Sequence, residues 1–176
     1  MSHLGSDPSV TLVVISGLPA VGKTTIASRL AQQIRAAHVR MDTIEQAVIE
    51  ATPLVQPLGP VGYVVGYAVA ADQLRNCVSV VADSVNPLAV TRSAWREVGA
   101  RHADRTVEVE VICSDPDEHR RRAETRTSSI PGLVLPTWPQ ILDREYEPWD
   151  RLPLIVDTAN ADLDACVTTL RRRADL

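Results

Sequence analysis

The sequence predicts an α/β fold in which a five-stranded parallel sheet carries helices on both of its faces. Short runs of β-branched residues alternate along the chain with segments of helical periodicity, and a glycine-rich loop joins the first run to the first helix. Such alternation is typical of right-handed crossover units, because each helix packs back onto the sheet between two parallel strands.

The first elements surround the glycine-rich loop. The run VTLVVIS at 10–16 is apolar almost throughout, as expected of a parallel strand that is covered on both faces. An apolar residue at every fourth position from Ile26 to Ile34 predicts the helix after the loop. The short run at 37–42 predicts a second strand that ends at Asp42, and a helix is expected at 43–50.

The middle of the chain repeats this pattern. The prolines of 52–60 exclude regular structure there, and 61–75 is expected to be helical. The run CVSVVAD at 77–83 predicts a buried strand that ends in an acid. Pro87 is expected at the first position of a helix over 87–103, where its missing N–H is not needed.

The last third begins with a strand at 106–113 and a well-marked helix start. Asp115 is expected as the N-cap, with Pro116 at the first position and Glu118 at the third, which approaches a capping box. A loop is expected at 127–139. The remaining elements expected are a short helix at 140–147, a strand at 152–157 and a helix at 161–173.

Composition and charge narrow the function classes. The 176 residues carry a net charge of −4, which argues against a broad electrostatic grip on nucleic acid or an anionic membrane. No apolar stretch approaches the roughly 20 residues that a membrane span needs. Residues 1–9 predict a disordered lead-in rather than a secretory signal, and 10–176 a single domain. Cys77, Cys113 and Cys166 lack metal-ligand spacing, which favours buried thiols in a cytoplasmic protein.

The loop GLPAVGKTT fits the pattern G-x-x-x-x-G-K-[ST], which binds phosphate groups. Its glycines reach backbone conformations that are closed to other residues, so that N–H groups curl around phosphates at the positive end of the next helix. Lys23 would reach the β- and γ-phosphates of ATP, and the Thr24 hydroxyl would ligate Mg²⁺. The residues predicted to hold the nucleotide here are Gly17, Leu18, Pro19, Ala20, Val21, Gly22, Lys23, Thr24 and Thr25.

Two acids are expected beside this loop, at the carboxyl ends of strands. Asp42 could accept the proton of an attacking hydroxyl, or could only cap the helix that follows it. Asp83 would bind Mg²⁺ through water, or would only be a turn residue ahead of Pro87. A kinase for small substrates needs acids at these places, whereas a GTPase needs a guanine-reading motif such as N-K-x-D, which the sequence lacks.

Phosphoryl transfer also needs mobile arginines that neutralise the transferred group, and the helix predicted to begin at Pro116 carries two candidates. Arg122 and Arg126 lie four residues apart on the face that also carries His119. Arg121 points elsewhere and is expected to be solvated. Because this helix leads into a loop that contains Pro and Gly, a lid over about 120–137 is expected to bring Arg122 and Arg126 to ATP.

Taken together, these residues resemble those of the small P-loop kinases, a group that includes shikimate kinase, gluconate kinase, adenylylsulfate kinase, chloramphenicol phosphotransferase and the kinase domain of polynucleotide kinase. The resemblance rests on the loop, RMD at 40–42, VVADSVNP at 80–87, R-x-x-x-R at 122–126 and VDT at 156–158. It spans about 10–172 and is strongest for short bacterial proteins described as AAA-family ATPases. It implies a P-loop NTPase three-layer sandwich with the strand order 2-3-1-4-5.

The resemblance also implies residue roles beyond the loop. Asp42 would face the phosphoryl acceptor and act as the base, Arg122 would flank adenine, and Arg126 would reach phosphate. The residues implied to border metal and substrate after the third strand are Asp83, Ser84 and Asn86. Those implied to lie near the nucleotide base are Asp157, Thr158 and the residues up to Asn160.

The sequence departs from these families at two positions, and both departures narrow the chemical class of the phosphoryl acceptor. Polynucleotide kinases carry an arginine three residues after the strand-2 aspartate, where it holds a phosphate of the acceptor, and Glu45 stands there in this sequence. An acid that faces a polyanion repels it, so a nucleic-acid acceptor is disfavoured. Shikimate kinase has paired glycines where Asp83 stands, which argues against a shikimate-like acceptor.

The sequence therefore predicts an ATP- and Mg²⁺-dependent phosphotransferase that acts on a hydroxyl of a small metabolite or antibiotic. Its catalytic residues would be Lys23, Asp42 and Arg126, while Thr24 and Asp83 would hold the metal. Two alternatives stay open: a polynucleotide or RNA 5′-hydroxyl kinase, and a nucleotide-dependent switch that binds a partner protein. The protein is expected to be a cytoplasmic monomer or homodimer that binds no membrane.

Overall fold

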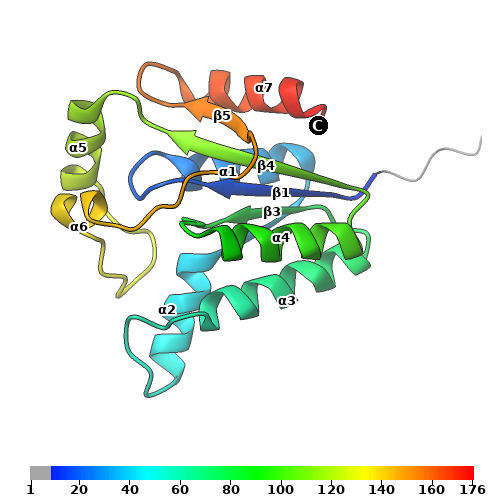
Figure 1. The fold of residues 1–176 in the computed structure, drawn as a ribbon, viewed down its shortest axis with the longest axis horizontal. Coiled ribbons are helices and arrows are strands. Elements are labelled where there is room, and N and C mark those ends of the chain that lie inside the picture. Colours follow the sequence, from blue (N-terminus) through cyan, green and yellow to red (C-terminus); the bar gives the residue numbers. More distant parts are fainter. Residues whose placement is uncertain (1–8) are drawn as a thin grey trace, which may run out of the picture.

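The computed structural model describes residues 9–176 and has the predicted α/β architecture (Figure 1). Five parallel strands form one sheet in the order β2-β3-β1-β4-β5, which confirms the predicted order. The strands are β1 (Thr11–Ser16), β2 (Ala37–Arg40), β3 (Val80–Asp83), β4 (Arg105–Ile112) and β5 (Leu154–Asp157). The helices are α1 (Lys23–Ile34), α2 (Met41–Ala51), α3 (Val61–Arg75), α4 (Ala89–His102), α5 (Pro116–Thr125), α6 (Trp138–Leu142) and α7 (Leu163–Ala174).

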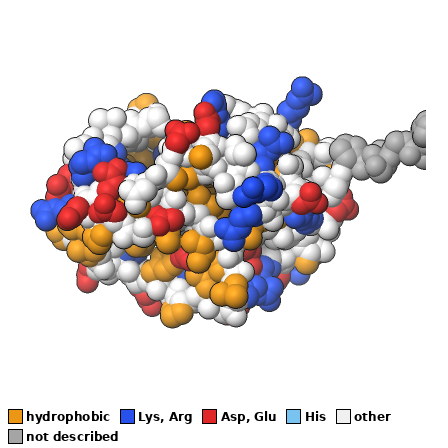
Figure 2. All heavy atoms as spheres, turned by 90° about the horizontal axis from the view of Figure 1, so that it is seen from above, with side chains coloured by type: hydrophobic (Ala, Val, Ile, Leu, Met, Phe, Trp, Pro, Cys, Tyr) orange, Lys and Arg blue, Asp and Glu red, His pale blue; other side chains and the backbone are white. Residues whose placement is uncertain are grey.

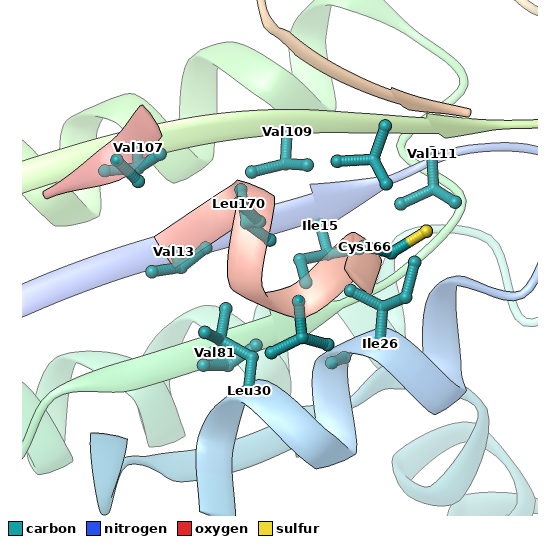
Figure 3. Close-up of a cluster of buried hydrophobic side chains, with 14 of the residues drawn as sticks. Val13, Ile15, Ile26, Leu30, Val81, Val107, Val109, Val111, Cys166 and Leu170 are labelled. Carbon is teal, nitrogen blue, oxygen red and sulfur yellow. The ribbon is translucent and has the colours of Figure 1, made fainter. Parts of the chain in front are cut away.

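The central strand β1 sends successive side chains to opposite faces of the sheet. Val13 lies in a core cluster with Ile26 of α1 and Leu170 of α7 (Figure 3). Leu12 lies in a second cluster, with Trp95 of α4 and residues of α3. Because both faces of β1 are covered in this way, nearly every position of the strand needs an apolar side chain, which explains the run VTLVVIS.

Trp95 anchors α4 to the second of these clusters. Its side chain is fully buried, and its ring packs edge-on against Tyr67 with 4.7 Å between the ring centroids. Its Nε1 donates a hydrogen bond of 3.1 Å to Oδ1 of Asn86, because a buried indole N–H needs an acceptor. Trp95 therefore ties α4 to the turn that follows β3.

The boundary between β2 and α2 differs from the prediction. The strand ends at Arg40 and the helix begins at Met41, so Asp42 lies in the first turn of α2 rather than at the end of the strand. The helix starts early because Met41 is buried against α3, where a Cβ atom on Gly66 would meet its Cε at 2.2 Å. Arg40 occupies the N-cap position, so the alternative role of Asp42 as N-cap is wrong.

Three other boundaries also differ. The third strand begins at Val80 rather than at 77, and the fourth helix begins at Ala89, so that Pro87 does not take its first position. A positive φ of 48° at Asn86 turns the chain there, and Leu88 stays extended as the N-cap. The helix predicted at 140–147 is α6, which begins at Trp138 and ends at Leu142.

The start of α5 follows the prediction in part. Oδ1 of Asp115 accepts hydrogen bonds from the backbone N–H groups of Asp117 and Glu118, which confirms Asp115 as the N-cap. The Glu118 side chain does not complete a capping box, because it accepts hydrogen bonds from Arg121 and Arg122 of the same helix.

Some predictions concern the ends of the chain and its cysteines. The lead-in predicted at 1–9 lies outside the described residues except for Ser9. Within residues 9–176, no helix has both the length and the apolar character needed to cross a membrane. The prediction of three buried thiols holds for Cys166, whereas Cys113 is half-buried. Cys77 is exposed because it lies in the turn between α3 and β3, where its φ is 59°.

Candidate active site

The phosphate-loop candidate joins β1 to α1 at the carboxyl end of the central strand. A Cβ atom at Gly17 would meet the Val111 carbonyl oxygen at 2.3 Å, and the residue has a φ of 142°. Gly22 has a φ of 93°. Both positions therefore need glycine. The first turn of α1 contains no acidic residue, so the positive end of its dipole is free to attract phosphate.

Two side chains from the second half of the sequence hold this loop. Nε2 of His119 lies 2.8 Å from the carbonyl oxygen of Pro19. The Thr158 hydroxyl donates a hydrogen bond of 2.8 Å to the carbonyl of Val21. Thr158 is predicted to lie near the nucleotide base, and the structure places its buried side chain against the loop.

Lys23 is buried at the start of α1 with its ammonium group inside the loop. Its Nζ lies 3.4 Å from the carbonyl oxygen of Leu18, which is a weak hydrogen bond. Burial lowers the pKa of Lys23, while the carboxylates of Asp83 and Asp42 act in the opposite direction. The ammonium group is therefore well placed to form stronger bonds to phosphate oxygens.

Asp83 ends β3 directly beside β1 and is 2% exposed. Its Oδ2 lies 3.4 Å from Nε2 of His38 and 3.9 Å from Nε of Arg40, and this oxygen forms no hydrogen bond within the described residues. Burial alone would raise the pKa of the Asp83 carboxyl, but His38 and Lys23 more than offset it, so that the pKa lies below its usual value. Asp83 is thus an ionised, buried carboxylate with an oxygen available to a ligand.

This carboxylate and the neighbouring Thr24 hydroxyl fit Mg²⁺. The hydroxyl stabilises the ionised form of Asp83 and so lowers its pKa. Residues 9–176 contain no group of three or more His, Cys, Asp or Glu side chains that could hold a metal ion. Mg²⁺ suits such a place, because it keeps several waters and is bound by one or two carboxylates together with substrate phosphates. Thr24 and Asp83 are the residues that would hold it.

Arg40 is a residue of the cleft that the sequence interpretation missed. Its side chain is 17% exposed, and Nη2 lies 3.6 Å from Oδ2 of Asp42. Its Nη1 donates a hydrogen bond of 3.1 Å to Oγ of Ser129, in the loop after α5. The residue therefore connects Asp42 to the expected lid. The signal was present in the motif RMD, where a cation stands at the carboxyl end of a parallel strand.

The two arginines predicted to bind ATP have different surroundings. Arg122 donates hydrogen bonds of 2.9 Å to both the hydroxyl and the carbonyl of Thr158, and its Nε binds Glu118. Arg126 follows the last residue of α5, and its Nε and Nη2 are buried without a partner among the described residues. Burial lowers the pKa of Arg126, and Asp42 opposes this shift. Arg126 therefore has hydrogen-bond donors available to an anion, whereas Arg122 uses its donors in contacts within the fold.

Asn86 and Asp157, which are also predicted to lie near ligands, make contacts within the fold. Asn86 is fully buried, and its side chain donates to Oγ of Ser16 and accepts from Nε1 of Trp95. Oδ1 of Asp157 accepts from two backbone N–H groups, one of them that of Ser114. Neither residue lines the cleft. We therefore assign them a supporting role in this conformation.

A cleft of about 1140 Å³ lies at the carboxyl ends of the strands, where α2, α5 and α6 gather (Figure 1). This volume lies slightly above the roughly 300–1,000 Å³ of a typical ligand pocket. The predicted site residues that line it are Pro19, Ala20, Gly22, Lys23, Thr24, Thr25, Asp42, Arg122 and Arg126. Of the other predicted site residues, Gly17, Leu18, Val21 and Asp83 do not line it. Lining residues that were not predicted to bind ligands include Arg40, Gln46, Tyr63 and Arg144.

A parallel sheet in the order 2-3-1-4-5, with a phosphate loop between its central strand and the first helix, defines a P-loop nucleotide-binding protein. The AAA_33 family model, described as an AAA domain, matches residues 12–132, which is more than half of the chain. The protein belongs to this family.

Several solved structures share the fold. The Mycobacterium tuberculosis APS kinase, in complex with AMPPNP and APS, has a TM-score of 0.69 at 18% identity over 96% of this chain and 99% of its own. Chaetomium thermophilum Kti12, in complex with ADP-AlF3, has a TM-score of 0.68 at 19% identity over 93% and 97%. A gluconokinase of Sinorhizobium meliloti has a TM-score of 0.60 at 17% identity over 97% and 96%. No curated protein matches the sequence significantly.

Proposed function

We propose that the protein is an ATP- and Mg²⁺-dependent phosphotransferase that transfers the γ-phosphoryl group to a hydroxyl of a small molecule. One observation carries this proposal: Lys23, Asp42 and the unpartnered guanidinium of Arg126 line the same cleft, of about 1140 Å³. A nucleotide on the phosphate loop leaves the part of the cleft beside α2 for an acceptor. A protein that only binds and hydrolyses a nucleotide needs no such compartment.

The surroundings of each residue set its role. Lys23 and the N–H groups of the loop orient the triphosphate, and Arg126 neutralises the charge that spreads over the transferred group. Asp42 takes the proton of the acceptor hydroxyl, whose oxygen forms the new bond to phosphorus as the bond to ADP breaks. Thr24 and Asp83 would hold Mg²⁺, which would supply further charge neutralisation on the phosphates.

The segment over about 120–137 acts as a lid in this proposal. Ser129 in this segment accepts a hydrogen bond from Arg40. A Cβ atom on Gly132 would meet Nε2 of Gln46 at 2.8 Å, so the tip of the lid lies close against α2. A lid that rests on the acceptor side excludes water, which directs the phosphoryl group to the acceptor rather than to hydrolysis.

The rival functions are a nucleic-acid end kinase and a nucleotide-dependent switch. Glu45 lines the cleft beside α2 and opposes a polyanionic acceptor. On the face shown in Figure 2, basic and acidic side chains are interspersed, so that face offers no broad basic surface to nucleic acid. ATP consumption should rise with a small hydroxylated compound under our proposal. If the protein is a nucleic-acid end kinase, ATP consumption should rise with 5′-hydroxyl oligonucleotides. If it is a switch, neither the small compound nor the oligonucleotides should raise ATP consumption.

We also place the protein in the reducing cytoplasm, as a monomer or a homodimer. Cys77, Cys113 and Cys166 are all free, and a reducing compartment keeps thiols in that state.

Asp42→Asn should lower kcat on the true acceptor by about 10²–10⁴-fold, because a base positioned against its substrate contributes that much. Asp42 is 44% exposed and is not the N-cap of α2, so the melting temperature should change little. Binding of Mg·ATP should survive, because Lys23 and the loop hold the phosphates. Rates of transfer, ATP titrations and thermal melts on both proteins test this. Parental transfer by the variant would remove Asp42 from the mechanism.

A further inference from the structure

The half of the cleft that lies away from the phosphate loop is lined by a different set of polar and charged side chains. We call it the acceptor compartment and define it by five lining residues from α2, the segment after it, α3 and the segment after α6: Asp42, Glu45, Gln56, Tyr63 and Arg144. Asp42 and Glu45 lie three positions apart on α2, so their carboxylates share one face of the helix. The compartment therefore carries two acids and one cation, and the neighbouring Arg40 pairs with one of these acids, Asp42.

The backbone of α3 gives the Glu45 side chain its place. A Cβ atom on Gly62 would meet Cγ of Glu45 at 2.3 Å and its Oε1 at 2.7 Å, so glycine at this position makes room for the carboxylate. The Gln56 side chain, from the segment after α2, stabilises the ionised form of Glu45 and so acts to lower its pKa. Next to it, the Tyr63 hydroxyl accepts a hydrogen bond of 3.1 Å from the backbone N–H of Asn86, which leaves its own O–H to donate. These side chains are therefore already positioned in the absence of an acceptor.

The negative charge of Glu45 is incompletely neutralised by its neighbours. Burial and the nearby Asp42 raise the pKa of the Glu45 carboxyl, and Gln56 and Arg144 reverse this only in part. A cation brought into the compartment would compensate the charge of the half-buried Glu45 carboxylate, because a charge that is partly removed from water needs a partner. An acceptor with a carboxylate or phosphate group would add a third negative charge instead.

Further cations of the cleft lie outside the acceptor compartment. Lys23 and Arg126 flank the phosphate loop, and Arg40 stands between Asp42 and Asp83. Lys23 and Arg126 are placed for the phosphates of ATP under the proposed function, and Arg40 already contacts Asp42 and Ser129. None of these three cations is therefore left to neutralise an anionic acceptor. The side of the cleft beside the phosphate loop is thus rich in cations, whereas Glu45 faces the part that is left for the second substrate.

We propose that the acceptor carries a protonated amine near the hydroxyl that is phosphorylated, and that Glu45 binds this ammonium group. The inference rests on the proposed phosphotransferase function and narrows its acceptor to hydroxylated amines, such as amino sugars and amino alcohols. An ammonium group donates three hydrogen bonds, and a charge-assisted bond to a carboxylate is about twice as strong as a neutral one. Asp42 remains free to take the hydroxyl proton.

The test compares acceptors that differ in charge on one carbon skeleton. Glucosamine, glucose and gluconate form such a set, within a library of hydroxylated compounds that is sorted into amine-bearing, neutral and acidic classes. The amine-bearing members should have a kcat/KM at least about tenfold above their matched neutral and acidic members. A best acceptor that is neutral or acidic would overturn the amine assignment and leave the phosphotransferase standing. Binding of Mg·ATP without transfer to any class would defeat both.

The Glu45→Gln variant tests the residue assignment. It should lower kcat/KM for the best amine acceptor by about 10- to 100-fold, the usual size of a hydrogen bond to a charged group, and should leave the KM for ATP unchanged. Gln keeps the shape of the side chain, and a thermal melt checks the fold. Glu97→Gln, on the exposed face of α4 and outside the cleft, is the matched control and should behave as the parent. A variant at Glu45 that keeps the parental preference for amines would contradict the assignment.

Discussion

Lys23→Ala is expected to abolish turnover and to weaken ATP binding while leaving the fold intact. The Lys23 ammonium makes one weak contact, to the Leu18 carbonyl, among the described residues, so it contributes to the ligand site rather than to the core. Lys23 is also the single lysine of the chain, so no other ammonium of a lysine can replace it. Burial opposes its charged form in the free protein, so its loss should not lower the melting temperature.

A thermal-shift titration with Mg·ATP measures this effect. The parent should be stabilised by about 2.7 kcal/mol when the free ligand is at 100 times its Kd, because a ligand stabilises the folded state that it binds. Lys23→Ala should show a much smaller shift at the same concentration. Asp42→Asn, which keeps the whole phosphate loop, is the matched control and should shift like the parent. Equal shifts for Lys23→Ala and the parent would remove Lys23 from the nucleotide site.

Arg126→Ala is expected to lower kcat by about 10³–10⁵-fold, because an arginine that neutralises the transferred phosphoryl group contributes that much in related systems. Arg126 lines the cleft, and its Nε and Nη2 are buried without a partner among residues 9–176, so an anion is the partner that these donors need. The KM for ATP should change less than kcat if the residue acts mainly in the transition state.

Arg121→Ala is the control for this prediction. Arg121 lies on the same helix, is 63% exposed and pairs with Glu118 at the surface. An exposed ion pair contributes little, so kcat should stay near the parental value. Single-turnover rates with saturating ATP separate the two variants. If they lose activity to the same extent, Arg126 has no special role and the lid assignment is wrong.

Most of the fold could be predicted because its signals are local. The strands β1 and β3 are buried along their whole length, and the runs that contain them, at 10–16 and 77–83, are correspondingly rich in β-branched residues. The phosphate loop is also a local signal, since the glycines required by its backbone lie within nine residues. The strand order came from the resemblance to small P-loop kinases, and it is confirmed.

The segment after α6 shows where local signals fail. Its sequence favours a helix over 140–147, yet the carbonyl groups of Glu147 and Pro148 accept hydrogen bonds from Arg92, which is fully buried 55 or more residues earlier. The same guanidinium lies 4.4 Å from the centre of the Trp149 ring. These contacts hold the segment outside a helix, and no pattern within the segment could reveal them.

Outside the phosphate loop, site residues could be predicted from the sequence where they lie directly after a predicted strand. A residue after a parallel strand is certain to lie near the sheet edge, but the sequence does not tell whether its side chain enters the cleft or the core. Asp42 and Asn86 were equal candidates on that basis, and only Asp42 lines the cleft. The space that Gly62 leaves for the Glu45 side chain depends on how α2 and α3 pack together, so it could be found only in the three-dimensional structure.

The central claim is that the γ-phosphoryl group passes to an acceptor hydroxyl rather than to water. The direct measurement incubates the parent protein with γ-labelled ATP, Mg²⁺ and the library of hydroxylated compounds, and then separates labelled esters from inorganic phosphate. Our account predicts a labelled phosphate ester that forms faster than inorganic phosphate, needs the acceptor, and disappears with Lys23→Ala. Label that is found only in inorganic phosphate, at a rate that no acceptor changes, would contradict the account and favour a nucleotide-dependent switch.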